Sequence, residues 1–238
     1  MPETVQDSFK TFKRTSLFTS PLVKLAHLLH ILRYMLPFAY HCRPAAASPR
    51  IATFLTAIKQ AEARKGTGKL PLGAVGVAWG GYFVVRACAG AEPNGEVGKG
   101  EKGNEGGWEG EKVLDAAFVA HPSNLTYPRD VKRIAVPVSW AAAETDRHMS
   151  PSQAETTKKI LAGKTARAKD EDGNASAVGR FGHEFAMYEG VRYGFAQGGM
   201  RKKVREAEAG ERAEEQAVQW FRRCFGTASE GEEESLAS

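Results

Sequence analysis

The sequence lacks the features that mark disulfide-rich, secreted and nucleic-acid-binding proteins. Its 238 residues contain only three cysteines, Cys42, Cys88 and Cys224. Three scattered thiols are too few for a disulfide framework and form no CxxC pair, so a reducing, cytoplasmic compartment is expected. The first ten residues, MPETVQDSFK, lack the apolar run of a signal peptide.

A dense basic run is also missing. The net charge is +5, but lysines and arginines are spread along the chain without interleaved aromatic residues. The sequence therefore predicts no nucleic-acid partner. With 42% hydrophobic and 26% charged residues, the composition is typical of a globular protein and excludes collagen-like and disulfide-rich classes. The length suits one domain, and composition alone does not select a function.

Residues 18–43 form the most apolar stretch and follow a polar lead-in at 1–17. About 20 apolar residues could cross a bilayer, yet Lys24 and Arg33 interrupt the run at a cost in hydrocarbon. Helical spacing of its leucines favours an amphipathic helix packed on a core, with no membrane span. Those leucines are Leu22, Leu25, Leu28, Leu29, Leu32 and Leu36.

Two histidines and two prolines lie in this region. His27 and His30 have near-helical spacing for a metal, but no third ligand is visible, so no metal site is expected. Pro37 and Pro44 are expected to break the helix.

Beyond residue 48, expected helices alternate with short, continuously apolar runs. Because strands covered by helices on both faces read as such runs, the pattern predicts an open, mostly parallel, doubly wound α/β sheet. The expected helices lie at 49–64, 82–90, 152–161 and 206–225, and the expected strands at 70–77, 113–120, 134–142 and 185–188.

Three segments have compositions typical of loops. Residues 90–112 are rich in Gly, Glu and Lys and cannot bury enough surface to offset their ordering entropy, which predicts a flexible insertion. Residues 163–180 are polar and basic and are also predicted as a loop, and 226–238 as an acidic, disordered tail. The remaining chain, 18–225, is expected to form a single domain.

The run Gly76-Val77-Ala78-Trp79-Gly80-Gly81 lies between an expected strand and an expected helix. That is the setting of a nucleophile elbow, a strained turn in which small flanking residues allow strand and helix to approach closely. The helix N-terminus then presents backbone N–H groups to an oxyanion. The central residue here is Ala78, which offers no nucleophile.

Several segments of the sequence resemble the dienelactone hydrolase family, particularly its fungal branch. The elbow is similar to the family's G-x-C-W-G-G, and the likeness runs from about Phe18 to Phe225 apart from the insertion. The other matching segments are Ala120-His121-Pro122-Ser123, Val136–Trp140 with Glu144-Thr145-Asp146, Tyr188–Ala196, which is similar to Y-x-G-V-R-H-G-F-A, and Ala213–Phe221.

The resemblance implies an α/β-hydrolase fold, no cofactor, and hydrolysis of a lactone or carboxylic ester through an acyl-enzyme. The triad positions would be Ala78, Asp146 and Tyr193, of which only Asp146 keeps the family's residue type. With pKa near 10, a tyrosine is a poor general base at neutral pH. Trp79, Gly80 and His121 would line the ligand site. The sequence therefore predicts a catalytically impaired member of the family, a pseudoenzyme that can bind a small lactone- or ester-like ligand.

Alternatives remain open at this point. The fold could serve a repurposed isomerase or cyclase that uses Tyr193, a small-molecule binding protein, or a product without function. His148 and His183 are weaker candidates for a replacement base, because neither occupies the expected base position. Cys88 is interpreted as a small buried hydrophobe and not as a displaced nucleophile.

Members of the family usually carry additional strands before the segment similar to 18–43. The resemblance therefore implies an N-terminally truncated fold, either because that portion is lost or because the start was assigned downstream of the true one. The strand Leu70–Val77 would then lie at an edge of the sheet, without a charged residue to protect it. An exposed apolar edge can pair with another chain, so self-association is expected.

Overall fold

The computed structural model describes residues 21–64, 70–89, 113–171, 175–197 and 204–226. The chain divides into two compact units, one of residues 1–51 with 102–107 and one of residues 52–101 with 108–238. The expected lead-in 1–17, the insertion 90–112 and the tail beyond Gly226 lie outside the described residues.

Two helices begin the described chain, α2 (Pro21–His41) and α3 (Pro44–Arg64). The expectation that Pro37 ends the first helix is wrong, since Pro37 lies inside α2 and the amide of Cys42 still donates to the carbonyl of Phe38 at 2.8 Å. The helix expected from residue 49 begins earlier, at Pro44, where a proline needs no N–H partner, and Pro49 lies inside α3.

The leucines of α2 are exposed, so the expected packing of this helix on a core is not found. Leu22 is 79% exposed and Leu36 is 62% exposed, whereas Ile31 is buried. By length and composition alone, the stretch Leu22–His41 is long and apolar enough to cross a membrane, and only 6% of it is buried. The helical spacing of the leucines therefore predicts a helix here, but it does not show what their side chains contact.

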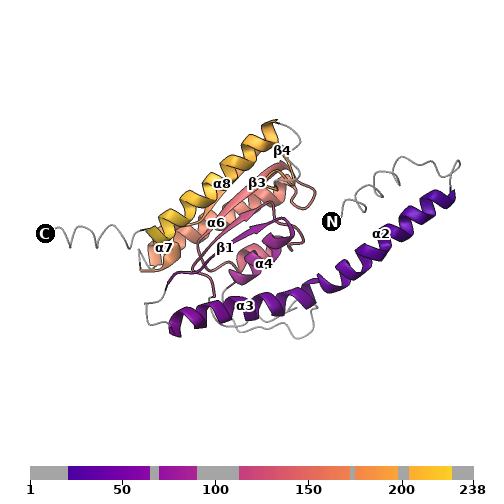
Figure 1. The fold of residues 1–238 in the computed structure, drawn as a ribbon. Helices are drawn as coiled ribbons and strands as arrows, with labels where there is room; N and C mark the ends of the chain where they lie inside the picture. The colour runs from indigo at the N-terminus through magenta and orange to yellow at the C-terminus, as the bar shows by residue number, and fades with distance from the viewer. Residues whose placement is uncertain (1–20, 65–69, 90–112, 172–174, 198–203, 227–238) are drawn as a thin grey trace. The chain divides into compact units, whose positions relative to one another are not determined.

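The second unit is built on four parallel strands in the order β1-β2-β3-β4 (Figure 1). The regular pairing of β3 with β4 is interrupted by a register shift between Ala143 and Thr145. The strands are β1 (Gly73–Val77), β2 (Ala116–Ala120), β3 (Val138–Thr145) and β4 (Glu184–Arg192).

Helices cover both faces of this sheet, which confirms the α/β fold class (Figure 1). Alternate residues of β2 face opposite sides, with Val119 packed in the core under α4, α5 and α6, and Phe118 in the core under α8. The helices are α4 (Trp79–Ala87), α5 (Arg129–Lys132), α6 (Pro151–Glu171), α7 (Ala177–Phe181) and α8 (Val204–Phe225).

The expected loop at 163–180 is largely helical and is a correction to the sequence interpretation. Helix α6 continues to Glu171, and α7 begins at Ala177 with Ser176 as its N-cap. The segment after Gly163 is polar, but Ala, Lys and Arg are strong helix formers. Its polarity reflects a solvated helix surface, because Lys169 and Asp170 are exposed.

Strand β1 lies at the edge of the sheet and, among the described residues, pairs only with β2. Its central side chain, Val75, is 57% exposed. We predict that the chain self-associates through this edge, because an unpaired apolar strand offers N–H and C=O groups to another chain. Val75→Lys should shift the protein toward monomer in size-exclusion chromatography with light scattering, and the uncharged β-branched control Val75→Thr should not. A monomeric wild-type chain at high concentration would contradict this prediction.

Candidate functional site

Ala78 occupies the turn between β1 and α4 with φ 51° and ψ −116°. This conformation is sparsely populated by residues other than glycine, costs about 1–3 kcal/mol, and persists only where the surrounding structure holds it. Three hydrogen bonds fix it: the Ala78 amide donates to the Ala120 carbonyl at 3.1 Å, and the Ala78 carbonyl accepts from the amides of Gly81 at 3.1 Å and Ser123 at 3.0 Å. The predicted strand–turn–helix elbow is thus present, and the side chain at its centre is a buried methyl group.

Close approach of β1, α4 and the loop after β2 depends on glycine at two positions. A Cβ on Gly76 would lie 2.8 Å from both the Gly81 Cα and the Val84 Cβ. A Cβ on Gly81 would lie 2.7 Å from the Pro122 Cβ and 3.0 Å from its Cα. Gly80, by contrast, would meet nothing within 4 Å. The glycines flanking the elbow are therefore not equivalent.

This difference gives a matched test of the elbow's packing. Gly81→Ala should lower the free energy of unfolding by about 1–3 kcal/mol, because the new methyl group overpacks against Pro122. Gly80→Ala, one residue away on the same helix, should leave it unchanged or raise it by about 0.4–1 kcal/mol. Denaturant unfolding followed by circular dichroism measures both variants, and equal effects would contradict the described packing.

His121 follows β2 and is fully buried with a positive φ of 34°. Its amide donates to the Ala141 carbonyl at 2.8 Å, and its Nε2 accepts from the Ala196 amide at 3.3 Å. Burial lowers the pKa of this imidazole to about 4, so it is neutral near pH 7. Its Nδ1 has no partner among the described residues. His121 therefore ties the end of β2 to the loop after β4 as a neutral group.

The depressed pKa of His121 predicts an acid-sensitive fold. In the unfolded chain the imidazole protonates near pH 6.5, whereas the folded chain resists protonation down to about pH 4. Between these values the unfolded state binds more protons, so stability falls as the pH falls, by up to about 1.4 kcal/mol per pH unit for this group. His121→Gln should make the unfolding free energy depend less on pH across this window. The same substitution at the exposed His41 serves as the control, and an unchanged slope in His121→Gln would contradict the prediction.

Asp146 lies in the turn after β3, where its carboxylate supports the turn itself. Oδ1 of Asp146 accepts from the amide of His148 at 2.7 Å. Burial raises the pKa of this carboxyl, while hydrogen bonds from the amides of His148 and Met149 oppose the shift. No hydrogen bond joins Asp146 to Tyr193 in the part of the chain that the structure describes. The position that resembles the triad acid is therefore not coupled to the position that resembles the triad base.

Tyr193 follows β4 and lies among two imidazoles and a guanidinium. Its ring centroid is 5.0 Å from that of His121 and 4.8 Å from that of His148, and the Arg147 guanidinium carbon lies 4.8 Å from it. The Nε of Arg147 donates to Nε2 of His148 at 3.1 Å. The structure thus brings His148 beside the expected base position, which its place in the sequence did not reveal.

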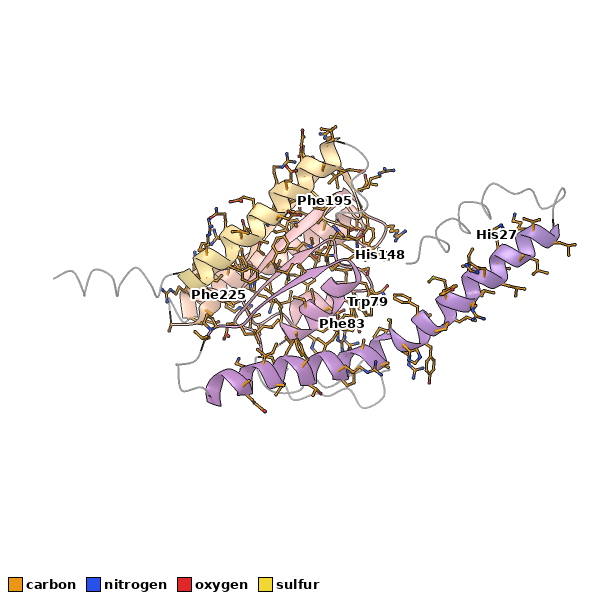
Figure 2. All side chains as sticks on the ribbon, in the orientation of Figure 1. His27, Trp79, Phe83, His148, Phe195 and Phe225 are labelled. Carbon is orange, nitrogen blue, oxygen red and sulfur yellow. The ribbon has the colours of Figure 1, made fainter. Side chains whose placement is uncertain are left out.

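Trp79 begins α4 directly after Ala78 and contributes one partly open side chain at this end of the sheet. Its ring packs edge-on against Phe83 with centroids 4.5 Å apart, and 37% of it is exposed. Figure 2 shows Trp79 and His148 at one end of the sheet and Phe225 at the other. Ala78, Trp79 and Gly80 therefore lie at the end of the sheet where the parallel strands have their carboxyl ends.

Two groups near this edge were missed by sequence reasoning. Arg147 contacts Tyr193 and His148, as described above. The Tyr127 hydroxyl is buried without a partner among the described residues, and burial, followed by the charges of Asp146 and Asp130, raises its pKa. Arg147 adjoins the acid turn in sequence and could have been noticed, but nothing in the local pattern indicates that the loop holding Tyr127 returns to Asp146.

His183 and Cys88, both weighed as chemical groups, lie elsewhere. The Cys88 thiol is 1% exposed and burial raises its pKa, so it is a buried apolar group. His183 directly precedes β4, whereas Tyr193 follows it, so the two lie at opposite ends of the same strand. The Nδ1 of His183 accepts from the Val138 amide at 3.3 Å. Burial and the neighbouring Lys164 lower the pKa of His183 to about 4.

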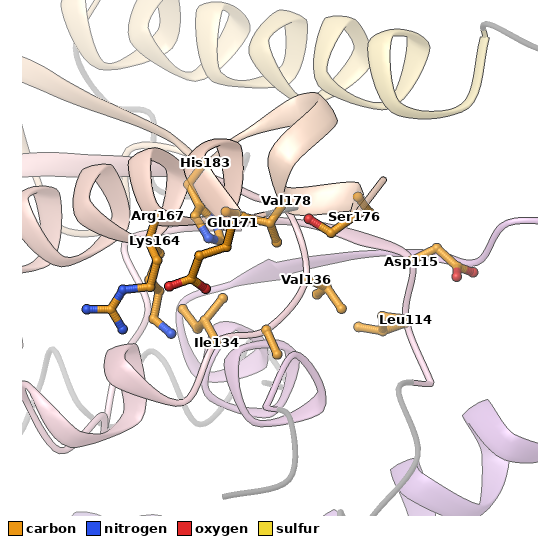
Figure 3. Close-up of a pocket in the computed structure, with 13 residues that line it drawn as sticks. Leu114, Asp115, Ile134, Val136, Lys164, Arg167, Glu171, Ser176, Val178 and His183 are labelled. Atoms are coloured by element: carbon orange, nitrogen blue, oxygen red, sulfur yellow. The ribbon is translucent and has the colours of Figure 1, made fainter. Parts of the chain in front are cut away.

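A cavity of about 330 Å³ lies beside His183, at the end of the sheet where the strands have their amino ends (Figure 3). Lys164, Arg167 and Glu171 of α6 line it together with Ser176, and burial lowers the pKa of Lys164. Its charges are mixed in sign and it does not adjoin the elbow. No group of three or more potential metal ligands occurs within the described ranges.

Comparison with known proteins gives similarity in structure and none in sequence. No family model matches the sequence, and no curated protein matches it. The structure is similar to that of a protein from Klebsiella pneumoniae subsp. pneumoniae MGH 78578 described as a "Putative Dienelactone Hydrolase", with a TM-score of 0.45 and 16% sequence identity. The match covers 72% of this chain and 60% of that protein.

Proposed function

We propose that this chain is a catalytically impaired α/β-hydrolase of the dienelactone hydrolase type that binds a small carbonyl compound without hydrolysing it. The observation that carries the proposal is the elbow at Ala78, whose backbone has the strained conformation of a nucleophile while its side chain is a methyl group. The sequence resemblance of the segments around 78, 146 and 193 supports the family type.

Loss of hydrolysis follows from the groups at the three positions. Ala78 cannot form an acyl-enzyme, and the Asp146 carboxylate hydrogen-bonds its own turn and no base. Because triad members act as a unit, little of the covalent route survives the loss of nucleophile and base together.

Binding rests on the elbow's backbone. Helix α4 begins at Trp79, and the first N–H groups of a helix point toward an anion or a carbonyl oxygen placed at its N-terminus. The space above Gly80 is open, and Trp79 offers a partly exposed aromatic face beside it. A small lactone, ester or carboxylate fits this combination of N–H donors and apolar surface.

Restoration of the missing groups tests the proposal. Wild-type protein should hydrolyse p-nitrophenyl acetate no faster than unrelated proteins of equal lysine content. The double variant Ala78→Cys, Tyr193→His should gain a thiol-reagent-sensitive activity at least about tenfold above either single variant, because the effects are non-additive.

The native cysteines provide an internal control for this experiment. Cys88, the C-cap of α4, is buried with a raised pKa and should not react, whereas Cys42 is partly exposed. Thiol labelling of the folded double variant is therefore compared with that of the wild type, and the excess reports the new cysteine. Saturable turnover by the wild type, or a folded and labelled double variant that stays inert, would contradict the proposal.

The cluster around Tyr193 favours a second candidate, a non-hydrolytic acid–base enzyme of the same fold. The Tyr193 ring contacts the rings of His121 and His148 and the Arg147 guanidinium. We infer that its phenol could donate a proton to a carbonyl oxygen bound there. Exchange of α-protons of small ketones with D2O, followed by NMR, distinguishes the two functions. Exchange by the wild type that Tyr193→Phe abolishes would favour this candidate, and its absence favours the binding protein.

A further inference from the structure

The cavity beside His183 is lined by a buried hydrogen-bond donor that no described residue satisfies. The Nδ1 of His183 accepts from the Val138 amide, and the ring is neutral near pH 7 because burial and Lys164 lower its pKa to about 4. A neutral imidazole that accepts at Nδ1 carries its proton on Nε2. The Nε2 of His183 is buried and, within the described ranges, has no hydrogen-bond partner. Since a buried N–H group is costly to leave unpaired, this donor points to an acceptor in the cavity.

Two cations of α6 lie beside this donor. Lys164 and Arg167 are three residues apart and therefore neighbours on one face of the helix, and both line the cavity. Burial, and then the charge of Arg167, lower the pKa of Lys164, so the two cations repel each other. Neither forms an ion pair with another described residue. Figure 3 shows both on the same side of the cavity as His183, whose amide donates to Oγ1 of Thr165 on α6 at 2.8 Å.

Two carboxylates also line the cavity, and they limit the charge that a ligand can carry. Oδ2 of Asp115 accepts from the Leu72 amide at 2.8 Å, and Asp115 lies on the far side of the cavity from Lys164 (Figure 3). Glu171, at the end of α6, is exposed, so water and salt screen its charge. A ligand with a single negative charge therefore fits this lining better than a dianion.

The rest of the cavity wall is largely apolar. Leu114, Ile134 and Val136 come from the segments that lead into β2 and β3, and Val178 comes from α7. The volume of about 330 Å³ is at the lower end of small-molecule sites, which span about 300–1,000 Å³. Donors on one side and apolar side chains along the wall suit a small molecule with one anionic group and an apolar body.

We propose that this cavity binds a small organic monocarboxylate. Its carboxylate would accept from Nε2 of His183 and pair with Lys164 and Arg167, while its apolar part lies along Ile134 and Val136. The cavity is at the amino ends of the strands, away from Ala78, so the inference does not depend on the function proposed for the elbow.

Titration of the full chain with benzoate, followed by NMR, tests this proposal. The imidazole C2 proton of His183 is identified as the resonance that is missing from the spectrum of His183→Asn. It should shift on addition of benzoate. Benzamide, which has the same shape without the charge, should shift it much less at equal concentration, because the bonds to Lys164 and Arg167 are then no longer charge-assisted at both ends.

Variants of the lining give matched affinities, measured from the broadening of the benzoate ring protons. His183→Asn keeps an acceptor near the Val138 amide but removes the Nε2 donor, and Lys164→Gln removes one charge. Each should weaken binding by at least about fivefold, because a hydrogen bond to the charged group is lost. Lys158→Gln removes the same charge from an exposed position of α6 outside the lining and should change the affinity by less than about twofold. Glu171→Gln should strengthen binding, since it removes a like charge.

Circular dichroism checks that each variant is folded, and Lys164→Gln decides the affinity comparison if His183→Asn is not. Failure of benzoate to shift the His183 resonance of the folded wild type would overturn the proposal. Benzoate binding that Lys164→Gln leaves unchanged would overturn it by placing the ligand elsewhere, such as the elbow. A larger shift of the His183 resonance with inorganic phosphate than with benzoate would overturn it in favour of a phosphate site.

Discussion

Close approach between a strand and a helix at the elbow is the constraint on which the rest of the candidate site depends. Gly76 and Gly81 have no room for a Cβ, because one would overlap Val84 and the other Pro122. The turn between these two glycines holds Ala78 at a positive φ. The same turn starts α4, so that the first N–H groups of this helix point toward the carboxyl end of the sheet. The site's geometry is therefore set by backbone packing, and it persists without a reactive side chain.

The remaining site residues follow from the same parallel sheet. His121, Asp146 and Tyr193 each come directly after a strand. Because the strands are parallel, these residues lie at the same carboxyl end of the sheet as Ala78. There, two of the polar side chains form hydrogen bonds that support the backbone. His121 accepts a backbone amide and Asp146 supports its own turn. The polar groups at this end of the sheet therefore support the fold itself.

Sequence reasoning predicted the fold where local signals were strong. Continuous apolar runs gave the four strands, and the glycine pattern located the elbow before its dihedral angles were known. It failed where composition was ambiguous, since the polar segment after Gly163 belongs to α6, and Pro37 lies within a helix. Contacts between distant segments could not be read either. The sequence position of His148 does not match the expected base position, yet the turn after β3 places its ring against Tyr193.

The central claim is that Ala78 keeps a strained elbow conformation although it has no nucleophile, and one substitution tests it directly. Glycine tolerates positive φ, so Ala78→Gly should relieve strain of about 1–3 kcal/mol and offset the loss of one buried methyl, about 0.8 kcal/mol. Its unfolding free energy should equal or exceed that of the wild type. Ala162→Gly, on an exposed position of α6, should lose about 1 kcal/mol. A loss in Ala78→Gly as large as in Ala162→Gly would show that no elbow exists.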